Sequence, residues 1–166
     1  MHVIATGDTR HTHTGSSMTR FVPYSQLRER AISSVTPLLR AHRYQRLIRM
    51  CMIFRRHAHL ESQSLDAALA ASIAARGARL AGQFARARRL IRLALPEMGE
   101  KALHEFVLIE MDVASAYERQ GRVGLARAAY RRASSLAGRG DPALVELIRH
   151  RSDSLAGAGH AQHKVR

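Results

Sequence analysis

Apolar residues recur at intervals of three and four along most of this chain, separated by short segments rich in glycine, proline and polar residues. This spacing is typical of α-helices with one buried face, and no segment has the pattern of a credible strand. The pattern predicts about seven helices, at residues 26–34, 37–57, 65–80, 84–95, 100–120, 123–137 and 142–155. The sequence therefore favours an all-α fold.

Several residues mark where the predicted helices begin and end. Thr36 before Pro37, and Asp141 before Pro142, each place an N-cap residue in front of a proline at the first helical position. Gly121 supplies the residue that most readily ends a helix in a left-handed conformation. These signals predict new helices at residues 37 and 142 and a helix end at residue 121.

The two ends of the chain differ from its middle. Residues 1–20 show no helical period and the residues from 157 to 166 are small and polar, so we expect a flexible arm and a flexible tail around one domain at 21–156. Met18 could be the natural start. The arm is too polar for a secretory signal, and no apolar run is long enough to cross a bilayer. We therefore expect a cytoplasmic protein without membrane insertion.

The chain contains an internal repeat at an offset of 39 residues, which aligns 71–94 with 110–133. Small residues and glycine occupy matching places in the two copies. The identical pairs are Ala75/Ala114, Gly82/Gly121, Ala87/Ala126, Arg88/Arg127, Arg92/Arg131 and Ala94/Ala133. The second copy has the pattern required for two closely packed antiparallel helices, with a glycine at the turn.

The succession Ala114, Tyr117, Gly121, Ala126 and Tyr130, followed by Ala133, resembles the tetratricopeptide repeat. The resemblance implies a right-handed stack of antiparallel helix hairpins, with hairpins at about 68–101 and 107–140 and a capping helix at 142–155. Glu110 departs from the family pattern, which has a large residue there. The alternative is an ordinary helical bundle whose alanine-rich helices imitate the repeat.

The resemblance also implies a function, because repeats of this family bind partner proteins on a concave face formed by the first helix of each hairpin. Carried over by position, the predicted groove consists of Leu69, Ser72, Arg76, Arg79, Leu108, Met111, Ser115 and Arg119. The helix around residues 106–111 is more apolar than one buried face requires. We expect either a groove for an apolar segment with acidic groups, or a helix covered by the chain itself or by a second copy in a homodimer.

The formal net charge is +14, and the first sixty residues hold ten arginines against Asp8 and Glu29. Such a charge attracts nucleic acids and acidic surfaces. One predicted helix carries a stripe suited to phosphate contacts: Arg40, Arg43, Arg46, Arg49, Arg55 and Arg56. Tyr44 and Phe54 are too few to stack bases. A basic, nucleic-acid-associated regulator is therefore the alternative to an adaptor or chaperone-like protein.

The sequence offers no catalytic or cofactor motif. Ten histidines are present, but none has the spacing or the companion ligands of a metal site. Cys51 is the only cysteine and falls on an apolar helical face, which is typical of a core residue. We expect a protein that is not an enzyme and that holds neither a metal nor a cofactor.

Overall fold

The computed structural model of the chain describes residues 22–138 and 141–162, and for residues 156–162 it describes the backbone alone. Within these ranges the fold is all-α, with seven helices and no strand. The helices are α1 (Tyr24–Arg40), α2 (Tyr44–Leu60), α3 (Ser64–Leu80), α4 (Phe84–Met98), α5 (Glu100–Arg119), α6 (Val123–Ala137) and α7 (Pro142–Gln162). The arm predicted at 1–20 and the last residues of the predicted tail lie outside the described residues.

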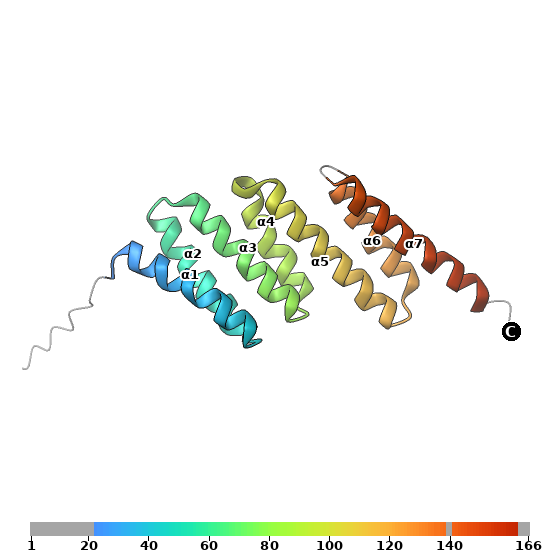
Figure 1. Ribbon diagram of the computed structural model, residues 1–166, viewed down its shortest axis with the longest axis horizontal. Helices are drawn as coiled ribbons and strands as arrows, with labels where there is room; N and C mark the ends of the chain where they lie inside the picture. The colour runs from blue at the N-terminus through green and yellow to red at the C-terminus, as the bar shows by residue number, and fades with distance from the viewer. Residues whose placement is uncertain (1–21, 139–140, 163–166) are drawn as a thin grey trace, which may run out of the picture.

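The helices form an elongated stack of antiparallel hairpins (Figure 1). Helices α1, α3, α5 and α7 lie side by side in one layer, here called the front layer, and α2, α4 and α6 lie behind them. Each helix packs mainly against its neighbours in the sequence, which is the arrangement of a helical-repeat stack. The predicted all-α, repeat-like architecture is confirmed.

The same turn ends four of the described helices, namely α1, α2, α3 and α5. The middle residue of each three-residue loop has a positive φ: His42 (53°), Ser62 (56°), Gly82 (71°) and Gly121 (68°). At the first of these turns the Arg43 N–H donates to the Leu38 carbonyl over 2.9 Å and the His42 N–H donates to the Leu39 carbonyl over 3.1 Å. This is the Schellman pattern of helix termination, and the other three loops repeat it. The helix end predicted at Gly121 is confirmed.

The helix start predicted at Pro37 is wrong. Pro37 lies inside α1, which ends at Arg40, and the chain turns at His42 before α2 begins at Tyr44. Proline removes the bond that its N–H would give to the Ser33 carbonyl. Ser33 and Pro37 are both exposed, so water can reach that carbonyl and the helix continues for one more turn.

The later helices follow the sequence prediction closely. Helix α6 has the predicted bounds, and α7 begins at Pro142, where the Asp141 side chain accepts a hydrogen bond from the Leu144 N–H over 3.0 Å. Helix α7 continues to Gln162 instead of ending near residue 155, and α4 passes through Pro96 to end at Met98. In the described ranges no helix is both long and apolar enough to cross a bilayer.

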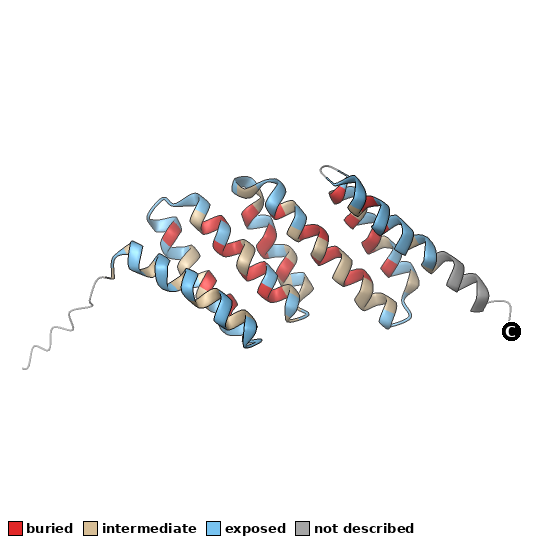
Figure 2. Ribbon diagram, viewed as in Figure 1, coloured by how far each residue is buried: buried red, intermediate tan, exposed pale blue. Residues whose placement is uncertain are grey.

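The core runs along the stack between the two layers (Figure 2). Every buried residue of α3 is alanine or glycine, which lets α2 and α4 approach it closely. A Cβ added at Gly77 would lie 3.2 Å from the Leu47 side chain and 3.3 Å from that of Ile48, so this face of α3 lies against α2. A second cluster, centred on the fully buried Tyr130, joins α5, α6 and α7. Helix α1 alone among the first six has no buried residue.

Candidate functional site

A buried carboxylate joins the two hairpins that carry the internal repeat. Glu110 of α5 is 2% exposed and accepts hydrogen bonds from Arg88 Nε (2.5 Å) and Nη2 (2.7 Å) of α4. Arg132 of α6 donates a further bond from Nε over 3.0 Å. The bonds to Glu110 raise the pKa of Arg88, although burial of the guanidinium opposes the change. Glu110 thus forms an ion-pair network that joins α4, α5 and α6.

A second ion pair crosses the front layer from α3 to α5. Arg79 donates from Nε to Glu105 and from Nη1 to Asp112, both over 2.8 Å, and the Arg79 side chain is only 13% exposed. Burial lowers the pKa of Arg79, but the bonds to Asp112 and Glu105 outweigh it and raise the pKa overall. Arg79, one of the predicted groove residues, is therefore engaged with acidic groups of this chain.

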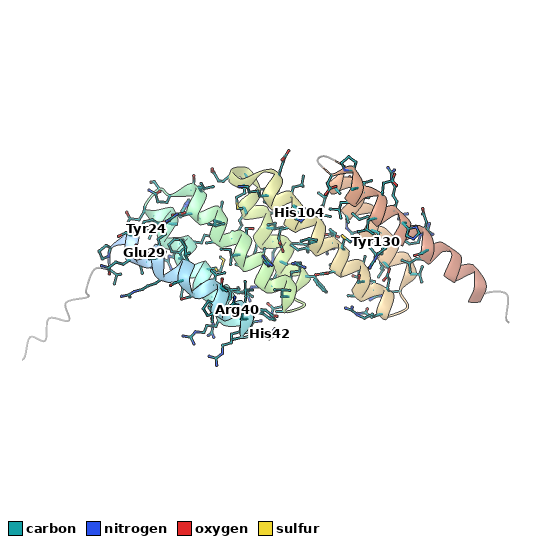
Figure 3. The ribbon with its side chains drawn as sticks, in the orientation of Figure 1. Tyr24, Glu29, Arg40, His42, His104 and Tyr130 are labelled. Carbon is teal, nitrogen blue, oxygen red and sulfur yellow. The ribbon has the colours of Figure 1, made fainter. Side chains whose placement is uncertain are left out.

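A third polar cluster ties α1 to α3 at the end of the stack where Tyr24 lies (Figure 3). The Tyr24 hydroxyl (2.7 Å) and Arg28 Nε (2.8 Å) both donate to Asp66 Oδ2. Desolvation and the bond to Asp66 raise the pKa of Tyr24 to about 12. Burial would raise the pKa of Asp66, but the hydrogen bonds from Tyr24 and Arg28 lower it overall. The Tyr24 ring also stacks on Phe54, with the centroids 5.7 Å apart.

The structure divides the other predicted groove residues between exposed and half-buried positions on the front layer. Exposed side chains belong to Leu69 (39%), Arg76 and Arg119, whereas Ser72, Leu108, Met111 and Ser115 are half-buried. On α1, Ile32 is 52% exposed and lines the same small apolar hollow as Leu69 and Ile73 of α3. The exposed aliphatic side chains of the front layer therefore lie mainly on α1 and α3, namely Ile32, Leu65, Leu69 and Leu80, with Leu147 on α7.

The high apolar content of α5 has a structural explanation within the chain. Phe106 and Ile109 belong to the core shared with α2, α3 and α4, whereas Val107 and Val113 belong to the core shared with α6 and α7. Met111 packs against the second core. Helix α5 thus has two buried faces, which account for much of its high apolar content.

The six arginines of the predicted stripe do not share one surface. Arg40 lies with His42 at the turn between α1 and α2, at the opposite end of α1 from Tyr24 (Figure 3). Arg43 is in the same turn and Arg56 is exposed near the end of α2. Arg55 is half-buried, and its Nε has no hydrogen-bond partner among the described residues. Arg46 and Arg49 lie together on an outward face of α2. The continuous helical stripe expected from the sequence is broken by the turn at His42.

Arg46 and Arg49 border a large groove between α1 and α2, here called the α1/α2 groove, whose volume is about 690 Å³. Its apolar lining comes from Leu27 and Ala31 of α1 and from Met50, Ile53 and Phe54 of α2. Ile53 is 62% exposed. Arg30, Ser34 and His57 complete the polar border of the groove, and none of the described residues that line it is acidic.

No described group of side chains has the composition of a metal site. In the ranges that the structure covers, no three histidine, cysteine or acidic side chains gather in a way that could hold a metal ion. Cys51 is 3% exposed, and burial raises the pKa of its thiol to about 11. A thiol in this environment is protonated at neutral pH and is a poor nucleophile.

No protein-family model matches the chain, and neither a curated protein nor a solved structure is similar to it in the comparisons. The resemblance to the tetratricopeptide repeat therefore stays a prediction.

Proposed function

We propose that this protein is an adaptor or chaperone-like module that binds a segment of another protein on its front layer. The observation that carries the proposal is the exposure of Ile32 and Leu69 side by side, beside the apolar hollow between α1 and α3. Exposed aliphatic side chains that meet across two helices mark interaction surfaces more often than single ones do. They also lie in the layer that the repeat resemblance assigns to partner binding.

The charges of the front layer favour an apolar segment that carries acidic groups. Arg28 and Arg79 are neutralised within the chain by Asp66, Glu105 and Asp112. Arg76, one helical turn from the partly exposed Ile73, is exposed and has no ion pair among the described residues. A carboxylate of a partner bound over Leu69 can therefore reach a free guanidinium.

The test is affinity capture with the wild type, with Leu69→Glu combined with Arg76→Glu, and with a matched control. The control combines Leu125→Glu with Arg131→Glu on α6, because Leu125 is also 39% exposed and Arg131 is also exposed. Both double variants change the net charge equally. Proteins captured by the wild type and the control but lost with the front-layer variant support the proposal. Equal capture by all three, or equal loss from both variants, contradicts it.

A further inference from the structure

We propose that the α1/α2 groove is a docking site for one helix of another protein, apolar along its centre and acidic on its flanks. The groove includes neither Ile32 nor Leu69, although Ala31, Met50 and Phe54 line both it and the hollow between α1 and α3. It lies at the N-terminal end of the described stack, where the described residues form no helix before α1. The proposal follows from the repetition of the fold.

The turns at His42, Gly82 and Gly121 align the first helices of the three hairpins, because each turn has the same backbone hydrogen bonds. In this alignment the α1 residues that line the groove each have a counterpart in α3 and in α5. Leu27, Arg30, Ala31 and Ser34 of α1 correspond to Ala67, Ala70, Ala71 and Ala74 of α3, and to Phe106, Ile109, Glu110 and Val113 of α5. All eight counterparts are buried, whereas none of the four α1 residues is.

The preceding helix of the stack covers these positions in the second and third hairpins. Helix α2 packs on α3 through Leu47 and Ile48, which approach Gly77. Helix α4 packs on α5, where the Arg92 guanidinium lies 5.8 Å from the centre of the Phe106 ring. In the first hairpin the same place is the α1 side of the α1/α2 groove. A repeat stack buries this face with a helix, so a helix is the element that the groove fits.

The charge of the groove determines the chemistry of that helix. Arg30, Arg46 and Arg49 border it, and none of them has an ion pair among the described residues. The apolar floor, with Ile53 62% exposed, requires aliphatic side chains on the occupant. An amphipathic helix with leucines facing Ile53 and carboxylates facing the arginines satisfies both requirements.

The described part of the chain offers no such helix. Residues 1–20 hold two arginines against one aspartate, and α7 holds Glu146 and Asp153 against Arg149 and Arg151. Helix α5 is acidic, but Glu105 and Glu110 are engaged inside the stack. A nucleic acid fits poorly, because a phosphodiester chain would cover an aliphatic floor and the Phe54 ring is already stacked on Tyr24. The occupant is therefore a helix of a different protein.

The length of the groove sets the size of a probe. The lining residues extend from Arg46 to His57 on α2, a distance of roughly 17 Å at 1.5 Å per residue, or about three helical turns. A synthetic peptide of about 18 residues spans this length with a margin. The probe carries leucine along one face and glutamate on both flanks. Two companion peptides replace the leucines by serine or the glutamates by lysine.

Fluorescence anisotropy then measures peptide binding to the full chain and to three variants. Ile53→Asp changes the floor of the groove, and Arg46→Glu combined with Arg49→Glu changes its border. The control combines Arg127→Glu with Arg131→Glu at a distant exposed site on α6, and it changes the net charge by the same amount as the border variant. We expect the acidic, leucine-bearing peptide to bind the wild type. Both groove variants should weaken binding by at least about tenfold, and the α6 variant by less than about twofold. Circular dichroism confirms that each variant is folded.

Several results would overturn the proposal. Equal binding of the serine peptide would show that charge alone attracts the probe, and equal loss in the α6 variant would show that the groove is not the site. Binding only after deletion of residues 1–20 would assign the groove to the chain's own arm. A dimer that Ile53→Asp converts to a monomer in light scattering would assign it to a second copy. A duplex DNA that binds in place of the peptide, and is lost with Arg46→Glu and Arg49→Glu, would assign it to nucleic acid.

Discussion

Among the charged side chains of the three ion-pair clusters, Glu110 is the one whose neutralisation is expected to lower the free energy of unfolding most. In Glu110→Gln the side chain keeps its shape, but an amide group then faces the guanidinium of Arg88, which stands 2.5 and 2.7 Å from the two carboxylate oxygens. Breaking a buried ion pair costs about 3–5 kcal/mol, because one charge is left without a partner. The Arg88 side chain is 26% exposed and can turn partly toward water, which reduces the expected loss to about 2–4 kcal/mol.

Two further variants separate the contribution of the Arg132 ion pair to stability from that of the Arg88 ion pair. The Arg132 side chain is 50% exposed, so Arg132→Ala should cost no more than about 1 kcal/mol. Arg88→Leu combined with Glu110→Leu removes both buried charges together. Because the desolvation cost of the pair disappears with the pair, this double variant should lie within about 1 kcal/mol of the wild type.

The assay is urea unfolding followed by far-ultraviolet circular dichroism, with the free energy of unfolding taken from linear extrapolation. The expected order of stability places the wild type, Arg132→Ala and the double leucine variant close together, with Glu110→Gln well below them. A Glu110→Gln variant within about 0.5 kcal/mol of the wild type would refute the account of the network. So would an Arg132→Ala variant as unstable as Glu110→Gln.

Further predictions concern the α1–α3 cluster and the turns. Asp66→Asn should lower the free energy of unfolding at neutral pH, because the lowered pKa of Asp66 in the folded state stabilises the fold while the carboxylate is ionised. The difference from the wild type should vanish as the pH falls below 3.8 and through the lowered folded-state pKa of Asp66. Urea unfolding from neutral to acid pH checks this, and a difference that persists in acid would contradict it. Ultraviolet titration of the wild type against Tyr24→Phe should assign to Tyr24 a phenol that ionises at about 12, and ionisation near 10 would be inconsistent with its burial beside Asp66. Ser62→Gly should raise the free energy of unfolding by about 0.5 kcal/mol, because the φ of 56° strains any residue with a Cβ, and a loss of stability would count against this explanation of the turn.

The sequence predicts the second half of the fold well because its signals there are local. Gly121 ends α5 with the positive φ that glycine adopts at little cost, and Asp141 caps α7 through its own side chain. The offset of 39 residues corresponds to the step between the α3–α4 hairpin and the α5–α6 hairpin. These elements are determined by residues that are close together in the sequence, so composition and spacing are sufficient to find them.

The first two helices could not be placed from the sequence, because their turns have no characteristic residue. His42 and Ser62 adopt the left-handed conformation that Gly82 and Gly121 adopt elsewhere, and backbone hydrogen bonds hold them there. The equal spacing of His42, Ser62 and Gly82 shows that the first three helices share one 20-residue unit, but three different residue types conceal it. Thr36 and Pro37 are therefore a stronger sequence signal for a helix boundary than His42, where the chain turns.

The sites depend on contacts between distant parts of the chain, which explains why the sequence indicated them only in part. Glu110 differs from the repeat pattern, and a charge at a core position signals that a partner must exist. Its partners Arg88 and Arg132 cannot be chosen in advance among 27 basic residues. Leu69 and Arg76, two of the predicted groove residues, are exposed, whereas the engagement of Arg79 depends on the packing of α3 beside α5.

Protein binding by the front layer is tested most directly by photo-crosslinking in the cells that produce the protein. A photoreactive amino acid replaces Leu69 in one sample and Leu125, which is equally exposed on α6, in the other. The account predicts discrete protein adducts from position 69, identified by mass spectrometry, that are missing from position 125. Identical adducts from both positions, adducts with nucleic acid, or no adduct from position 69 would contradict it.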